Sequence, residues 1–140
     1  MTLPAPNYLA VLVAGVLIFM LGGLWYSPVL FAKPWMAQMG KTEADFKASA
    51  AGMNMPLSYL MVFLCGLITA WALALVILGL GATTAMSGAG VAAICWLGFV
   101  GATSFGTSLF SMERRGLWLI NTTYNLVAFV VAGIVLALWR

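Results

Sequence analysis

The apolar residues of this chain fall into four long runs that are joined by more polar segments. The runs cover residues 7–26, 57–80, 91–111 and 117–139, and none of them contains Asp, Glu, Lys or Arg. A helix of about 20 apolar residues crosses the roughly 30 Å of hydrocarbon in a bilayer. The pattern therefore predicts an all-α fold, a single transmembrane domain over residues 1–140 built as a four-helix bundle.

The first connection is the longest, and it carries two short helix patterns. Pro34 suits the first position of a helix and Gly40 suits its exit. Thr42 and Asp45 have the spacing of a capping box, in which each side chain bonds to the backbone N–H of the other. We expect one or two short amphipathic helices lying at the membrane interface here. A plain polar connector is the alternative interpretation.

The distribution of basic residues predicts an orientation. Lys33, Lys41 and Lys47 lie in the first connection, Arg114 and Arg115 lie in the last, and only Arg140 belongs to the other side. Basic residues near the ends of spans favour the cytoplasmic side of a membrane. We therefore expect the two charged connections to be cytoplasmic and both termini to lie outside.

Composition excludes several classes of function. The chain has no His and only 6% charged residues, against about 25% in ordinary soluble domains. Proton exchange through a carboxylate within the membrane has no candidate residue, and a net charge of +3 is too small for nucleic-acid binding. Cys65 and Cys95 each lie within an apolar run. A buried cysteine usually acts as a small hydrophobic residue. We expect no enzyme activity, no metal and no cofactor.

Neutral polar residues gather at the cytoplasmic ends of the predicted spans. Asn121 and Asn125 share a helix face, and rows at Thr103 and Thr107 and at Ser104 and Ser108 offer them partners across the helix pair. One interpretation is a cytoplasm-facing polar cavity; the other is that these groups only hold the helices together. The candidate ligand-binding residues are Trp25, Tyr26, Tyr59, Thr103, Thr107, Asn121, Tyr124 and Asn125.

Two further features concern partners. Gly98, Ala102 and Gly106 form a row of small residues, which lets two helices approach closely. The row packs either within the chain or against a second copy, and we expect a homodimer. Arg114 and Arg115 are candidates for contact with lipid headgroup phosphates, and the alternative is a solvated turn.

The segment Trp25-Tyr26-Ser27-Pro28-Val29-Leu30-Phe31, followed by Lys33 and Trp35, resembles a bacterial integral-membrane family catalogued as domain of unknown function 1761. The resemblance covers the whole chain. It rests on Asn7, Gly22, Trp25, Tyr26, Pro28 and Trp35. It implies a four-span protein of the bacterial cytoplasmic (inner) membrane, and it supplies no activity.

These observations favour a non-enzymatic membrane protein that binds, and in one version transports, a small amphiphile or lipid. The first alternative is an accessory subunit that has a membrane-protein partner. The second is a passive channel or uniporter for a small solute. The apolar outer half of the bundle argues against a continuous pore.

Overall fold

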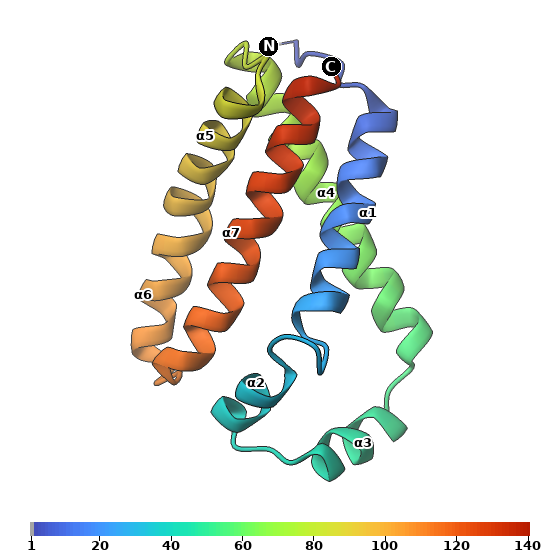
Figure 1. The fold of residues 1–140 in the computed structure, drawn as a ribbon, viewed down its shortest axis with the longest axis vertical. Helices are drawn as coiled ribbons and strands as arrows, with labels where there is room; N and C mark the ends of the chain where they lie inside the picture. The colour runs from blue at the N-terminus through green and yellow to red at the C-terminus, as the bar shows by residue number, and fades with distance from the viewer. Residues whose placement is uncertain (1) are drawn as a thin grey trace.

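The computed structural model describes residues 2–140, and every regular element within it is a helix. Four long helical spans run side by side, with both termini at one end and two short helices at the other (Figure 1). We call these the termini end and the loop end. The elements are α1 (Tyr8–Trp25), α2 (Ala32–Met39), α3 (Glu43–Ala51), α4 (Met55–Gly79), α5 (Ala85–Cys95), η1 (Trp96–Gly101), α6 (Ala102–Phe110) and α7 (Arg115–Leu138).

The observed helix limits match three of the four predicted spans within two residues. The third span, formed by α5, η1 and α6 together, is different because it begins at residue 85 and not at residue 91. Thr84 and Ser87 form a capping box that begins this helix. The polar, glycine-rich sequence around them is more typical of a turn. The predicted start of the third span at residue 91 was therefore wrong.

The third span contains a π-helical segment, η1, which the hydrophobic pattern did not indicate. Such segments are rare and occur mostly as single turns inside α-helices. The Trp96 ring packs beside Gly101, where an added Cβ would lie 3.4 Å from two ring carbons. The Trp96 indole N–H also donates to the Thr122 carbonyl oxygen of α7 at 3.0 Å. Trp96 thus ties the irregular turn to the neighbouring helix.

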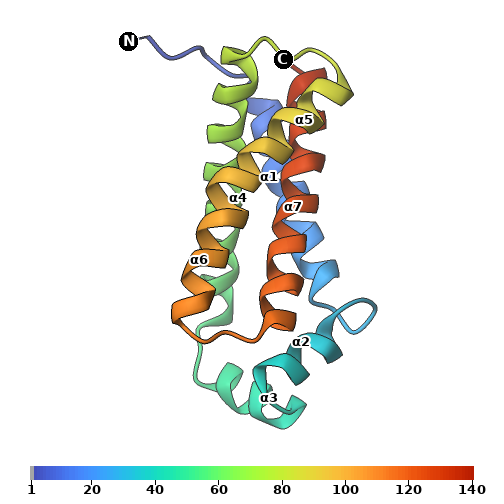
Figure 2. The same ribbon diagram turned by 90° about the vertical axis from the view of Figure 1, so that its left-hand side faces the viewer.

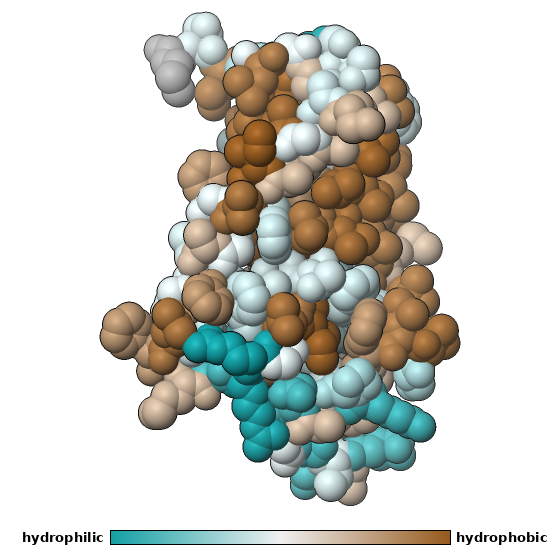
Figure 3. All heavy atoms as spheres, turned by 60° about the vertical axis from the view of Figure 1, so that its left-hand side comes forward, coloured by the Kyte–Doolittle hydropathy of each residue, from teal (hydrophilic) through white to brown (hydrophobic). Residues whose placement is uncertain are grey.

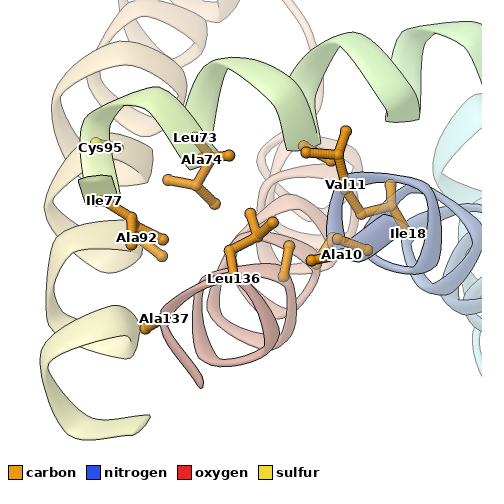
Figure 4. Close-up of a cluster of buried hydrophobic side chains, with 14 of the residues drawn as sticks. Ala10, Val11, Ile18, Leu73, Ala74, Ile77, Ala92, Cys95, Leu136 and Ala137 are labelled. Carbon is orange, nitrogen blue, oxygen red and sulfur yellow. The ribbon is translucent and has the colours of Figure 1, made fainter. Parts of the chain in front are cut away.

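Helix α7 packs against α5, α1 and α4, and Figure 2 shows it beside α5 near the termini end. The core between these helices consists largely of alanine, together with a few larger aliphatic side chains. Figure 4 shows Leu73 and Ala74 of α4, Ala92 of α5 and Leu136 of α7 converging with residues of α1. Small side chains let helix backbones approach closely, and this is how helices associate where lipid removes the hydrophobic driving force.

The closest approach joins α5 to α7 through two glycines. A Cβ added at Gly133 would lie 2.6 Å from both the Ala92 Cβ and the Gly88 carbonyl oxygen. A Cβ added at Gly88 would overlap the Gly133 carbonyl oxygen and lie 2.6 Å from the Ala137 Cβ. Neither position has room for a side chain, so these two glycines set the distance between the helices.

We expect Gly88→Ala to destabilise the protein by about 1–3 kcal/mol, because the added methyl group forces α5 away from α7. Gly90→Ala is the matched control on the same helix, since a Cβ there meets nothing within 4 Å. It should leave stability unchanged or raise it, because Ala favours helices. Thermal unfolding followed by far-UV circular dichroism in detergent checks both variants. Equal effects of the two changes would contradict this account of the interface.

The two short helices follow the predicted caps. Gly40 ends α2 with a left-handed φ of 67°, and Thr42 begins α3 with a complete capping box to Asp45. The backbone N–H and then the hydroxyl of Thr42 donate to the Asp45 carboxylate, and these bonds lower the pKa of Asp45. Helix α2 begins at Ala32 and not at Pro34, the predicted first position.

Hydrophilic residues gather at the loop end of the molecule, and the long flank above it is mainly hydrophobic (Figure 3). Arg114 lies at this end, where its guanidinium donates to the Ala37 carbonyl oxygen of α2 at 3.1 Å. Ala37 belongs to the last turn of α2, where a positive charge also interacts favourably with the helix dipole. Arg114 therefore fastens α2 to the start of α7.

A candidate lateral groove in the helix bundle

Two adjoining cavities form a groove between α4 and α7, which we call the lateral groove. The larger part, of about 400 Å³, lies between α4, Cys95, Phe99 and Phe129. The smaller part, of about 180 Å³, continues toward α1 and is lined by Tyr124 and Asn125, among others. Thr69 and Phe129 line both parts. The groove therefore has one long apolar arm and one shorter arm with polar groups.

Asn125 supplies the strongest hydrogen-bonding group of the groove. Its side-chain N–H donates to the Asn121 carbonyl oxygen of the same helix at 3.1 Å. Within residues 2–140 its Oδ1 accepts no hydrogen bond, and a carboxamide nitrogen carries a second N–H. The half-buried Asn125 side chain therefore offers one acceptor and one donor to a bound molecule.

Thr122 lies one helical turn from Asn125, toward the loop end. Its residue is only 5% exposed, and its hydroxyl oxygen has no hydrogen-bond partner among the described residues. Burial of an unpaired hydroxyl costs about 1–3 kcal/mol. Thr122 lines neither part of the groove, so this hydroxyl is an unpaired polar group in the interior of the bundle and not part of the candidate site.

Four of the predicted site residues form a cluster of hydrogen bonds that joins α1 to α7, namely Trp25, Tyr26, Asn121 and Tyr124. The Tyr26 hydroxyl donates to the Asn121 Oδ1 at 2.8 Å, and the Trp25 indole N–H donates to the Ile120 carbonyl oxygen at 3.0 Å. Tyr124 joins the same cluster, because its hydroxyl donates to the Ile18 carbonyl oxygen at 2.9 Å. These groups already have partners, and they hold the loop-end halves of α1 and α7 together.

An aromatic chain continues from this cluster into the short helices. Ring centroids are 5.6 Å apart for Tyr124 and Tyr26, 5.1 Å for Tyr26 and Trp35, and 5.1 Å for Trp35 and Phe46. Aromatic pairs at such distances contribute about 0.5–1.5 kcal/mol beyond their buried area. The chain of rings therefore connects α7 to α3, which has no buried residue of its own.

The remaining candidate residues lie away from this cluster. Tyr59 is 56% exposed on the outer surface of the bundle, with its ring edge-on to Phe19. Thr103 and Thr107 line a shallow depression on α6, which shares Phe99 with the groove but none of its other lining residues. The structure thus divides the predicted residues among three places, and ligand binding by Tyr59, Thr103 and Thr107 stays a prediction.

The predicted hydrogen bonds between the hydroxyl rows and the two asparagines were wrong. Thr103 and Thr107 donate to carbonyl oxygens of their own helical segment, at 2.6 and 3.1 Å. Ser104 instead accepts from the Trp118 indole N–H at 3.0 Å, and Ser108 accepts from the Arg115 guanidinium at 3.3 Å. The long side chains of α7 reach across to α6, so the serines bind them and not the amides.

The row at Gly98, Ala102 and Gly106 does not pack within the chain. Gly98 and Ala102 are exposed, and a Cβ added at either glycine meets nothing within 4 Å. The idea that this row joins helices inside the bundle was therefore wrong, because Gly88 and Gly133 do so. A homodimer through this row stays a prediction, as does contact of Arg114 and Arg115 with phosphates. Both arginines have partners within the chain.

Sequence reasoning missed the residues that give the groove its walls. Thr69, Cys65, Cys95 and Phe129 come from three helices, and nothing in their spacing joins them. One signal was present, because Thr69 is a hydroxyl near the middle of an otherwise aliphatic run. Polar residues at that depth are costly and mark functional positions in membrane helices.

The fold has the pattern of a multi-pass membrane protein, with four helices long and apolar enough to cross a bilayer. The chain belongs to a family of proteins of unknown function, DUF1761, whose model matches residues 9–137. This confirms the resemblance carried by the Trp-Tyr-Ser-Pro segment. Comparisons with curated proteins and with solved structures gave no match.

The hydrogen bond between Tyr26 and Asn121 leads to a prediction. Tyr26→Phe keeps the ring but leaves the Asn121 oxygen unpaired in an apolar bundle, so we expect a loss of about 1 kcal/mol. This corresponds to a melting temperature lower by about 3 °C, measured by circular dichroism in detergent. Tyr59→Phe is the control, because the Tyr59 hydroxyl bonds to no described residue; a loss of the same size there would contradict the assignment.

Proposed function

We propose that this protein binds a lipid-like small molecule in the lateral groove between α4, α5 and α7. The observation that carries the proposal is the combination of a long apolar arm with an Asn125 carboxamide whose oxygen and second N–H are free. An amphiphile matches this arrangement, because its chain replaces lipid along the apolar arm and its head pairs with the amide. Ligand sites commonly combine apolar walls with a few polar groups.

The location of the groove supports entry from the bilayer. Its long arm is walled by side chains of α4 on one side and by Cys95 and Phe99 on the other. The outer faces of these spans bear exposed apolar residues such as Ile68, Ile94 and Leu97. A molecule dissolved in the hydrocarbon therefore reaches the groove without crossing water.

Native mass spectrometry on protein extracted in a mild detergent tests this proposal. We expect a retained small-molecule mass that is reduced at least threefold in Asn125→Leu, because the substitution removes the polar partner. Thr107→Val is the matched control, since Thr107 lines the depression on α6 and neither part of the groove. Circular dichroism shows whether both variants keep the helical fold.

Two results would overturn the proposal. One is the absence of any retained mass when the protein is extracted from its native membrane. The other is loss of the retained mass in Thr107→Val but not in Asn125→Leu, which assigns the binding site to α6.

We further propose that the protein lies in a bacterial cytoplasmic membrane with its loop end in the cytoplasm. Support comes from the five basic residues that lie at this end, against Arg140 at the other.

Cysteine labelling in intact cells tests this orientation. In a Cys65→Ala/Cys95→Ala background, we expect a cysteine replacing Arg140 to react with a membrane-impermeant maleimide. One replacing Ser49 in α3 should react only after lysis, because the membrane separates it from the reagent. The reverse pattern excludes the proposed orientation.

A further inference from the structure

We infer that the lateral groove selects amphiphiles with a small uncharged head that both donates and accepts a hydrogen bond, as a long-chain alcohol does. This inference rests on the proposed function and names the chemical class of its ligand. Three features of the groove lead to it: the depth of its polar group, the charge of its walls and the unused hydrogen bonds of Asn125.

The depth of Asn125 excludes the headgroup of an ordinary phospholipid. Helix α7 has 24 residues, so it is about 36 Å long, and Asn125 lies about 15 Å from its start. Thr69 likewise lies near the middle of α4. A bilayer has a hydrocarbon core of about 30 Å, so both residues lie near its centre. A phospholipid keeps its charged headgroup at the interface, far from this position.

The charge of the walls excludes ionised heads. None of the residues lining the two parts of the groove is Asp, Glu, Lys, Arg or His. An ion taken into an apolar interior without a partner of opposite charge loses several kcal/mol of hydration. A neutral hydroxyl or amide head costs far less and is fully compensated by hydrogen bonds.

The hydrogen-bonding groups specify the head further. Asn125 presents an oxygen that accepts and a second N–H that donates, both on one planar carboxamide. A hydroxyl group pairs with both, because it carries one proton and two lone pairs. A ketone or ether pairs only with the N–H and leaves the Asn125 oxygen unsatisfied. The groove therefore favours an alcohol over a purely accepting head.

Photolabelling in phosphatidylcholine nanodiscs tests the inference, with a hexadecanol that bears a diazirine on its chain as the probe. Labelled residues are mapped by peptide mass spectrometry, and we expect them on α4 between residues 68 and 76 and near Phe129. Because one neutral hydrogen bond contributes about 1 kcal/mol, Asn125→Leu should lower this labelling about fivefold. Asn125→Gln, which retains the carboxamide, should restore part of it.

Competition identifies the head. Unlabelled hexadecanol should suppress labelling of the groove, whereas hexadecyl sulfate, with the same chain and a permanent charge, should not at equal membrane concentration. Equal suppression by the two would overturn the inference and leave the proposed function standing, because the groove would then bind the chain alone. Undiminished labelling in Asn125→Leu would also overturn it. If the retained mass of the native protein is absent as well, the proposed function fails with it.

Discussion

The architecture depends on the direct contact of two backbones, where α5 and α7 meet at Gly88 and Gly133. Because no side chain separates them, α7 is held close to α5, and α1 and α4 pack on its remaining faces. Helices α1 and α4 also approach closely at glycines, since a Cβ added at Gly66 would lie 3.4 Å from the Gly15 carbonyl oxygen. Dispersion between closely packed atoms takes the role that the hydrophobic effect has in soluble cores.

The groove follows from where this close packing stops. Toward the termini end the facing residues are Gly and Ala, and the backbones touch. Near the middle, the π-helical segment follows α5, and Phe129 of α7 lines both parts of the groove, whereas Phe99 is 76% exposed. The glycine contacts between α5 and α7 lie nearer the termini end, and the lateral groove lies beside α4. The bundle thus combines a closely packed half with a half that contains the groove.

The sequence predicted the parts of this structure that depend on local physics. Uninterrupted apolar runs place helices, and the cap residues Gly40, Thr42 and Asp45 act over a few positions. The start of α5 was not predicted, because Gly, Ala and Ser are typical of turns. Thr84 nevertheless caps a helix there. The groove was not predicted for a different reason. It depends on how three spans are rotated relative to one another, and the sequence pattern of a single helix does not contain that information.

The two asparagines of α7 show the same limit of prediction from sequence, because their roles differ only in the folded bundle. From sequence, Asn121 and Asn125 are equivalent, since both are amides on one helix face. In the bundle the Asn121 oxygen accepts a hydrogen bond from the Tyr26 hydroxyl, and this bond joins the end of α1 to α7. Among residues 2–140 the Asn125 side chain bonds only to its own helix, and it retains an acceptor and a donor. An unpaired polar group near the centre of a membrane is costly. The unpaired oxygen and N–H of Asn125 lie in a cavity, which favours a binding role for this residue over a structural one.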